Sequence, residues 1–227
     1  MEKIAIIELD EKALKLSIYK VSNGKSVLSL SKTQNFSLGE ELDKDELLNP
    51  NTKNELLEIL KVYRKMIEGY GVGKIVSVTT NVILKARNYR GFLDEIYNNT
   101  GLNFVILSDE DYIKNLFNAV VNSIDSAKGI FIYVGAYVSY VVKYNRRAIL
   151  GSSILPFGTY NTISQGKNLD EVVKEIRAKI KIEGVLEDVE EDSRIVGLGN
   201  SFISMGKIAK KCGYPFLLLP LLDYIVN

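Results

Sequence analysis

The residue types available for chemistry are restricted, because the chain of 227 residues contains no histidine. Mechanisms that need a Ser–His or Cys–His pair, or histidine as a metal ligand, are therefore excluded. Acid–base catalysis would have to use carboxylates, lysine, tyrosine or water. A lone cysteine, Cys212, excludes a disulfide framework and a cysteine-rich zinc site, and it is typical of a reducing compartment.

Two short segments carry groups that could act on a ligand. The turn Gly197–Ser201 joins a predicted strand to a predicted helix, and the amides of such a turn can bind a phosphate or nucleotide. The segment Ser108–Asp111 opens an apolar helix and has the spacing of a capping box, with Asp109 and Glu110 at the positive end of the helix. Capping explains this cluster without catalysis but is compatible with a chemical role for Glu110, so both interpretations stay open.

The first half of the chain alternates between strand-like and helix-like hydrophobic patterns. Asn23-Gly24 between two alternating runs predicts a β-hairpin, and an apolar stripe at helical spacing then follows. The predicted elements are, in order, strands at 4–8, 14–18 and 27–36, a helix through 56–67, a strand at 75–78, a helix around 92–97, a strand at 104–107 and a helix from 108 to about 122.

The second half repeats this order at a nearly constant spacing. Its predicted elements are strands at 130–134, 138–144 and 148–155, a helix through 172–180, an acidic loop at 187–192, a strand at 194–196 and a helix after Gly199. A long internal repeat implies two similar domains with a cleft between them. We expect an α/β fold of two tandem βββαβα domains, residues 1–124 and 125–227.

Five short segments carry a family resemblance, and they occur in the family's order over nearly the whole chain. They resemble motifs of the exopolyphosphatase/guanosine-pentaphosphate phosphohydrolase (Ppx/GppA) family, within the actin/hexokinase/Hsp70 superfamily. The segments are Phe36–Leu42 (Leu-Gly-Glu-Gly-Leu in the family), Val78–Asn88 (Val-Ala-Thr-Ser-Ala-Leu-Arg-Glu-Ala-x-Asn), Val105–Asp111 (Val-Ile-Ser-Gly-x-Glu-Glu), Leu155–Gly158 (Leu-Pro-Leu-Gly) and Gly197–Ser201 (a Gly-Gly-Thr turn). The resemblance implies two actin-like, ribonuclease H-like domains, the second of them short at its C-terminus.

The resemblance also implies a phosphate-binding turn after the first strand of each domain, and both turns are altered. In the first, the family pattern Asp-Ile-Gly-Ser-Asn-Ser-x-x-Arg is replaced by the segment Glu8–Lys15, in which the glycine becomes Asp10. Asp10 and Glu11 bring negative charge to the phosphate position, which costs about 1 kcal/mol per like-charge pair in water at ~4 Å. Glu8 keeps the carboxylate of the metal-binding aspartate and is the candidate metal ligand; a solvated acidic turn is the alternative.

In the second turn, Asp-Ile-Gly-Gly-Gly-Ser-Thr-Glu is replaced by the segment Tyr133–Tyr140, in which Gly135 is the one glycine kept. Tyr133, Tyr137 and Tyr140 would fill a phosphate site; they could stack on a base or sugar, but strand and core packing is the interpretation we favour. The family's arginine falls on Leu84, so a phosphate clamp is missing as well.

Three functions follow from this pattern. The first is a Ppx/GppA-like protein that hydrolyses phosphoanhydrides weakly or not at all and binds a phosphorylated ligand. The second is an active exopolyphosphatase or nucleotide phosphohydrolase with Mg²⁺, and the third is a non-catalytic protein-interaction module. The resemblance gives Glu110 as the candidate base, Glu8 as the candidate metal ligand and, as phosphate- or nucleotide-binding residues, Gly135, Gly197, Gly199, Asn200 and Ser201.

The composition limits the classes of partner that the protein is expected to bind. Lys and Arg number 29 against 28 Asp and Glu, and a net charge of +1 gives no electrostatic surface for nucleic acid or anionic lipid. The apolar run Phe216–Leu222 is interrupted by Pro220 and is much shorter than the ~20 residues of a membrane helix. We therefore expect a cytoplasmic protein without nucleic-acid or membrane partners. The family resemblance implies polyphosphate or a guanine nucleotide as the ligand, and a homodimer is the assembly considered.

Overall fold

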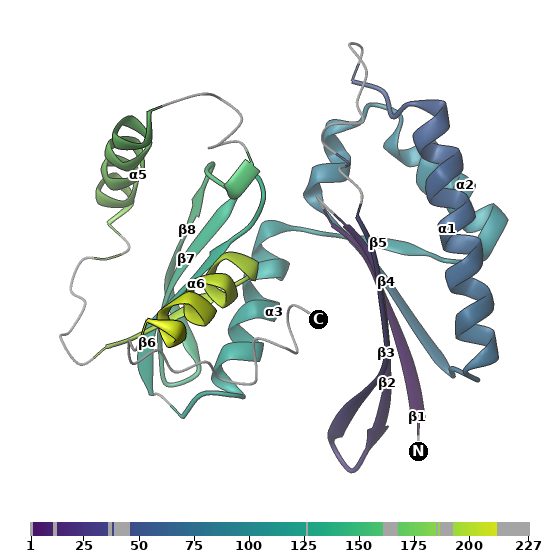
Figure 1. Cartoon of the computed structure of the whole chain (residues 1–227), viewed down its shortest axis with the longest axis horizontal. Helices are drawn as coiled ribbons and strands as arrows, with labels where there is room; N and C mark the ends of the chain where they lie inside the picture. Colours follow the sequence, from purple (N-terminus) through teal and green to yellow (C-terminus); the bar gives the residue numbers. More distant parts are fainter. Residues whose placement is uncertain are drawn as a thin grey trace. The chain divides into compact units, whose positions relative to one another are not determined.

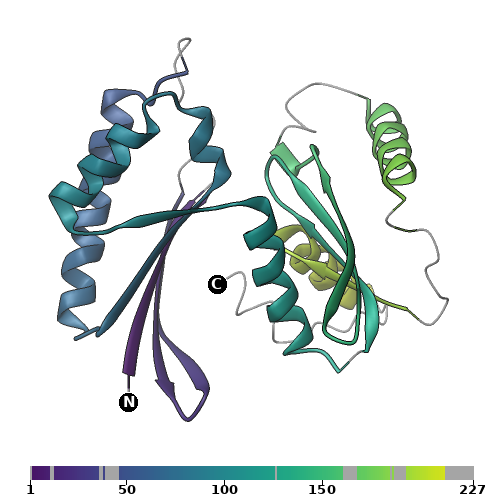
Figure 2. The same cartoon turned by 180° about the vertical axis from the view of Figure 1, so that it is seen from behind.

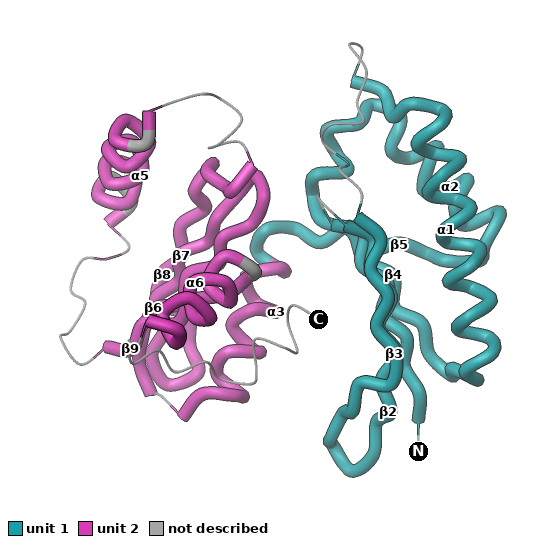
Figure 3. Tube along the Cα trace, in the orientation of Figure 1, with its two compact units in different colours: residues 1–110 teal, residues 111–227 magenta. Residues whose placement is uncertain are grey.

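The computed structural model describes residues 2–10, 13–35, 38, 46–125, 127–160, 168–184, 186 and 193–212. The chain divides into two compact units, residues 1–110 and residues 111–227, which Figure 3 distinguishes by colour. Within the described ranges, no helix is both long and apolar enough to cross a membrane.

Unit 1 is a five-stranded sheet in the order β3-β2-β1-β4-β5. Strands β1, β2 and β3 are antiparallel neighbours, whereas β4 runs parallel to β1 and β5 runs parallel to β4. Among the described residues of this unit, two helices and a 3-10 turn accompany the sheet. The bounds are β1 Glu2–Leu9, β2 Ala13–Ser22, β3 Lys25–Asn35, α1 Pro50–Gly69, β4 Lys74–Thr80, η1 Asn81–Lys85, α2 Tyr89–Thr100 and β5 Phe104–Leu107.

The two faces of this sheet differ in burial because the strand pattern alternates. Ala5, Ile7 and Leu9 of β1 are at most 1% exposed and join the core beneath α1 and α2, whereas Ile6 and Glu8 on the opposite face are half-buried. Figures 1 and 2 show α1 and α2 together on one side of the sheet. The face that carries Glu8 is therefore the less covered of the two.

Local signals explain how the elements of unit 1 begin and turn. The Asn49 side chain accepts a hydrogen bond from the Asn51 N–H at 2.9 Å and caps α1, whose first residue is Pro50. Asn23 and Gly24 have φ values of 51° and 72°, as the two-residue turn between β2 and β3 requires. The hairpin predicted from Asn-Gly is thus confirmed.

Unit 2 repeats the plan: its described residues form a four-stranded sheet in the order β8-β7-β6-β9, in which β9 runs parallel to β6. The first three strands are again antiparallel neighbours. The bounds are α3 Asp109–Val121, β6 Lys128–Val134, β7 Ser139–Asn145, β8 Ala148–Leu155, α5 Leu169–Glu183, β9 Arg194–Leu198 and α6 Asn200–Lys211. The predicted βββαβα order is confirmed in both halves, and the predicted acidic loop at 187–192 lies outside the described residues.

The repeat extends to an irregularity of the sheets. The pairing of β2 with β3 shifts register after Ile18, and the pairing of β7 with β8 shifts after Lys143. Ile18 lies opposite Ala5 and Lys143 lies opposite Ile130, so the two shifts occupy the same place in the two units. Bulges are features that related sheets keep, and this one supports the internal repeat independently of the sequence pattern.

The compact units and the predicted domains differ in where they place helix α3. The sequence places the division after residue 124, whereas the compact units divide after residue 110. The apolar side of α3 lies in the core of unit 2, together with Phe131 of β6 and Tyr144 of β7. Figures 1 and 2 show α3 and α6 on opposite faces of the unit 2 sheet. The domain bounds 1–124 and 125–227 therefore stay a prediction.

Candidate functional site

The carboxyl ends of β1, β4 and β5 meet at one edge of the unit 1 sheet, because these three strands are parallel. Glu8 lies near the end of β1, Asn81 follows β4, and Asp109 begins α3 after β5. The Asn81 side-chain amide donates a hydrogen bond to the Asp109 carboxylate at 2.8 Å and so connects two of these strand ends. Polar and acidic groups are therefore gathered at this edge of the sheet.

Glu8 is held in a mixed environment at this edge. It lies directly opposite Lys15 in the register of β1 with β2. Burial raises the pKa of Glu8, the Lys15 ammonium offsets part of that rise, and Asp10 adds to it. Burial also lowers the pKa of Lys15, while the two carboxylates oppose that change. The neighbour that balances the charge of Glu8 is thus a lysine.

The residues at the predicted metal position do not fit Mg²⁺. This ion prefers several oxygen ligands, usually carboxylates and waters. Glu8 faces an ammonium group, and the matching position of unit 2 is a phenol, Tyr133. Throughout the described ranges, no three histidine, cysteine, aspartate or glutamate side chains are grouped so that they could hold a metal ion. We therefore derive no chemistry from a metal bound to these residues.

Glu110, the candidate base, lies in the first turn of α3 and is exposed. Ser108 comes immediately before the helix, as the capping interpretation requires. The neighbouring Asp109 is the residue that bonds Asn81. Both interpretations of Glu110 stay predictions, because an exposed carboxylate at a helix start suits capping electrostatics and access to a substrate equally.

In unit 2, the turn after β6 is closed by backbone hydrogen bonds. The Gly135 N–H donates to Val138 O at 3.0 Å, and Gly135 O accepts from the Thr159 N–H at 2.9 Å. The Tyr160 N–H donates to Ala136 O at 2.8 Å. The chain after β8 is therefore held against this turn by two backbone hydrogen bonds.

Gly158 makes that approach possible. A Cβ atom at this position would meet the backbone of Ala136 and Tyr137, which cannot move aside as the end of a side chain can. The Ser139 hydroxyl also donates to Phe157 O at 2.6 Å and fixes the same segment. The Leu155–Gly158 segment, which the sequence matched to a family motif, thus has a packing role.

The ring of Tyr133 lies between the two glycine turns of unit 2. A Cβ on Gly135 would lie 3.1 Å from Cε1 of this ring, and a Cβ on Gly199 would lie 3.6 Å from Cε2. The ring stacks on Tyr140 at 5.8 Å between centroids and meets Tyr112 of α3 edge-on at 5.5 Å. Its hydroxyl is 3.2 Å from that of Tyr112. The packing role predicted for Tyr133 and Tyr140 is confirmed.

The second glycine turn joins β9 to α6. Gly199 has a φ of +97°, precedes the helix, and leaves its first turn without a side-chain cap. At Gly197 a Cβ would meet the ring of Phe202, so this glycine accommodates an aromatic side chain. Asn200 is the first residue of α6, with its side chain outside what the structure describes, and Ser201 is half-buried. Gly135 and Gly199 are thus brought together around one ring, whereas Gly197 serves packing.

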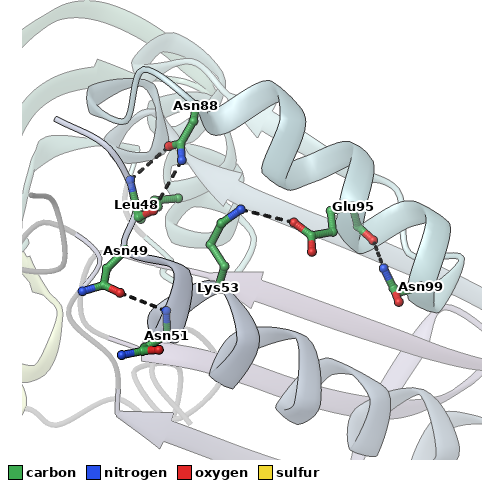
Figure 4. A network of polar contacts seen from close by, with 7 residues as sticks. All are labelled: Leu48, Asn49, Asn51, Lys53, Asn88, Glu95 and Asn99. Atoms are coloured by element: carbon green, nitrogen blue, oxygen red, sulfur yellow. Dashed lines mark hydrogen bonds and ion pairs between the residues drawn. The ribbon is translucent and has the colours of Figure 1, made fainter. Parts of the chain in front are cut away.

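Two residues of the Val78–Asn88 motif have positions that the sequence did not give. Leu84, at the position of the family's arginine, is 48% exposed on η1. Asn88 accepts a hydrogen bond from the Leu48 N–H at 3.0 Å and donates to Leu48 O at 3.4 Å, so it ties the chain before α1 to the start of α2 (Figure 4). An asparagine side chain can donate and accept a hydrogen bond at once. The presence of an asparagine at position 88 was therefore the one signal in the sequence that could have indicated this double contact. Of the motif Phe36–Leu42, the described part is Leu38, which is buried.

Comparison with solved structures gives the fold. The chain is 22% identical to the Aquifex aeolicus Ppx/GppA family member, with a TM-score of 0.79 over 95% of this chain and 72% of that one. An exopolyphosphatase from Cytophaga hutchinsonii is 13% identical, with a TM-score of 0.77 over 96% and 73%. A Bacteroides thetaiotaomicron protein with an actin-like ATPase fold is 12% identical, with a TM-score of 0.53 over 100% and 93%. The predicted α/β, actin-like fold is confirmed.

No curated protein matches the sequence. A family model does: that of the Ppx/GppA phosphatase family matches residues 17–209. Phosphatases of this family act on polyphosphate or nucleotide substrates and are generally metal-dependent. The match covers most of the chain and both units, and it agrees with the order of the motifs and with the fold. The chain therefore belongs to the Ppx/GppA phosphatase family.

Proposed function

We propose that this protein keeps the scaffold of the Ppx/GppA family but hydrolyses phosphoanhydrides weakly or not at all. The observation that carries the proposal is the position of the Tyr133 ring between Gly135 and Gly199. Glycines in phosphate-binding turns let the backbone approach the anionic oxygens. Here the space that two glycines leave free is occupied by an aromatic side chain of the same chain.

Three further differences from the family's motifs are also expected to lower the rate of hydrolysis. Phosphoanhydride hydrolysis needs fixed donors and cations around the phosphate and an oriented water. The turn after β1 carries Asp10 in place of glycine, Leu84 replaces an arginine, and Glu8 faces Lys15. Loss of one positioning donor costs on the order of 10²–10³ in rate. Several losses together would reduce turnover by about 10⁴ or more.

A phosphorylated ligand at the turns of unit 2 is the binding part of the proposal. It rests on the start of α6, where Gly199 provides no side-chain cap and the first N–H groups of a helix attract an anion. Polyphosphate or a guanine nucleotide is the ligand class that the family suggests. Of the residues that the resemblance implies, Gly199, Asn200 and Ser201 are the proposed contacts. Gly135 lies against the Tyr133 ring and Gly197 against the Phe202 ring, so we do not expect these two to touch the ligand. A cytoplasmic location is also proposed, on the grounds of the lone Cys212.

The test is phosphate release from long-chain polyphosphate and from guanosine pentaphosphate, with and without Mg²⁺. We expect equal, background rates for the wild type and for Glu110→Gln, at least about 10⁴-fold below an active exopolyphosphatase measured alongside. Turnover that requires Mg²⁺ and disappears in Glu110→Gln would overturn the proposal and make Glu110 the base of an active hydrolase.

Binding is tested separately from turnover. Tripolyphosphate and GTP are titrated into the isotope-labelled protein while the backbone amide resonances are followed. We expect the largest shifts at Gly199, Asn200 and Ser201. If those resonances do not move at millimolar ligand, the phosphorylated-ligand part is wrong, and a protein-interaction role becomes the better interpretation.

A further inference from the structure

The turn between β7 and β8 holds two arginines in an unfavourable backbone conformation. Arg146 and Arg147 have φ values of 45° and 64°. Residues with a side chain disfavour this left-handed region, and two-residue turns of this kind prefer Asn-Gly. The matching turn of unit 1 consists of Asn23 and Gly24. Backbone strain that a simple substitution would relieve is often found at functional sites, so the two arginines call for a functional explanation.

The packing of unit 2 does not explain why these two residues are arginines. Both are exposed. The ion pairs found within the described residues involve neither of them. The turn is closed by a backbone contact, in which the Arg146 N–H donates to Ala127 O at 2.6 Å. Asparagine and glycine could form the same contact, since it requires the main chain alone.

Other cationic residues lie at the same end of the sheet. Lys128 begins β6 and lies opposite Asn145, the residue before the turn. Lys143 lies two residues before Asn145 on β7. Residues advance by about 3.3 Å along a strand, and paired strands lie about 4.8 Å apart. The two lysines are therefore close to the arginine turn, and we call this group the basic end. It consists of Lys128, Lys143, Arg146 and Arg147.

The sequence around the basic end contains few carboxylates. Between Asp125 and Asp170 the chain has no acidic residue. Asp125 precedes β6 and is exposed, so it offsets part of the positive charge. Arg194 of β9 lies opposite Gly129, but acidic residues precede it in the sequence, and we do not count it. The basic end is thus a local excess of positive charge in a chain whose net charge is +1.

The residue types at the basic end indicate the class of anion. A guanidinium group can donate two parallel hydrogen bonds to one phosphate, which suits arginine to phosphate recognition. Proteins that bind single-stranded nucleic acid add aromatic rings on which the bases stack. The aromatic residue nearest the turn in the sequence, Tyr144, is 1% exposed and is not available for stacking. The site therefore suits a chain of phosphates without bases.

We propose that the basic end of unit 2 binds inorganic polyphosphate, with Arg146 and Arg147 as the main contacts. Lys128 and Val134 mark the two ends of β6, and seven residues of strand span about 20 Å. The site is therefore separate from the turn that follows Val134 and from the proposed contacts at Gly199. The choice of polyphosphate as the ligand rests on the proposed function, whereas the position of the site does not.

The first test follows the backbone amide resonances of the isotope-labelled full chain during titration with long-chain polyphosphate. We expect the resonances from Asn145 to Ala148 to shift. They differ from those of Gly199, Asn200 and Ser201, so failure of this proposal and failure of the proposed function are distinguishable. Resonances of the β7–β8 turn that stay unmoved at millimolar phosphate would overturn the proposal on the unmodified protein.

The second test removes the arginine side chains and keeps the turn. Arg146→Asn with Arg147→Gly gives unit 2 the turn residues of unit 1, so a loss of binding would not result from a poorer turn. At about 0.1 M salt, we expect the affinity for long-chain polyphosphate to fall at least about tenfold. The slope of log affinity against log salt should fall by about 1–2, because two phosphate contacts are lost.

The matched control removes the same charge beside the turn of unit 1. Lys20 and Lys25 are exposed and flank Asn23-Gly24. Lys20→Asn with Lys25→Gln should change the affinity less than about twofold, since a distant surface charge contributes little. Equal losses in the two double variants would overturn the proposal, because total charge and not the arginine turn would then attract the polymer.

Single-stranded polyuridylate tests the ligand class. It offers phosphates together with bases, and we expect it to bind the wild type more weakly than polyphosphate at equal phosphate concentration. Tighter binding of polyuridylate, lost in Arg146→Asn with Arg147→Gly, would overturn the assignment to polyphosphate and make the basic end a nucleic-acid site.

Discussion

Near the turn that joins its first two strands, each unit has an equivalent cross-strand pair, and the two pairs differ in their chemistry. In unit 1, Glu8 lies opposite Lys15. In unit 2, Tyr133 lies opposite Tyr140, and their rings stack. The backbone around them is the same: the N–H of the residue after each strand donates across the turn, from Asp10 to Ala13 O at 2.9 Å and, in unit 2, from Gly135 to Val138 O at 3.0 Å.

This comparison distinguishes the backbone features that the two units share from the side chains in which they differ. Backbone pairing, register and the place of the bulge depend on the alternation of apolar residues, which both halves retain. The side chains at the carboxyl edge are free to change without altering that pattern. Unit 1 therefore retains a charged edge and unit 2 has an aromatic one, although their strands follow one plan. Family membership and the proposed weak or absent hydrolysis are compatible for this reason.

The largest expected effect tests whether the chain after β8 packs rigidly against the turn that follows β6. Gly158→Ala would place a Cβ against the backbone of Ala136, so it should lower the free energy of unfolding by about 3 kcal/mol. Gly151→Ala in β8 is the matched control, because nothing lies within 4 Å of its Cβ position. Urea denaturation of both variants gives the comparison, and equal stabilities would show that the Gly158 contact is not rigid.

The next effect concerns the ring between the glycine turns. Tyr133→Ala removes contacts with Tyr112 and Tyr140 from a half-buried site and should lower the free energy of unfolding by about 2 kcal/mol. Tyr133→Phe keeps the ring and loses the hydroxyl contact to Tyr112, so about 0.5–1 kcal/mol is expected. Thermal and urea unfolding distinguish the two. Similar losses for both variants would mean that the hydroxyl, and not the ring, holds this position.

The hairpins of the two units provide a third comparison. Arg146 and Arg147 adopt φ values of 45° and 64° in the turn between β7 and β8, where unit 1 has Asn23 and Gly24. Side chains disfavour this conformation, so Arg146→Asn with Arg147→Gly should stabilise the protein by about 1–2 kcal/mol. Gly24→Ala should have the opposite sign and cost about 1 kcal/mol. A destabilised double variant would show that the arginines make contacts that outweigh the backbone strain.

Sequence patterns predicted the elements and their order because hydrophobic periodicity reports on which face is buried. They also predicted the Asn23-Gly24 turn, which has a strong local signal. They did not predict that α3 packs in unit 2, since a periodic stripe does not identify the surface it will cover. The Tyr133 ring was expected to pack, but its position between Gly135 and Gly199 depends on two turns that are distant in sequence. Contacts of that kind leave no local pattern to detect.

The smallest expected effect is a change in the free energy of unfolding with pH. It tests the charged pair Glu8 and Lys15 of unit 1. Because burial raises the pKa of Glu8 above its usual 4.5 despite Lys15 opposite, the folded state binds this proton more readily than the unfolded state. The stabilisation from the neutral carboxyl is fully present below pH 4.5 and is lost as the pH rises through the pKa of the folded state. The free energy of unfolding of the wild type should therefore fall relative to that of Glu8→Gln as the pH rises from 4 to 8. In unit 2, the difference in stability between wild type and Tyr133→Phe is the reference, because this pair contains no carboxylate. Urea denaturation at a series of pH values measures both gaps. A constant gap for Glu8→Gln would show that Lys15 fully compensates the burial of Glu8, so the two edges would differ in charge but not in their response to pH.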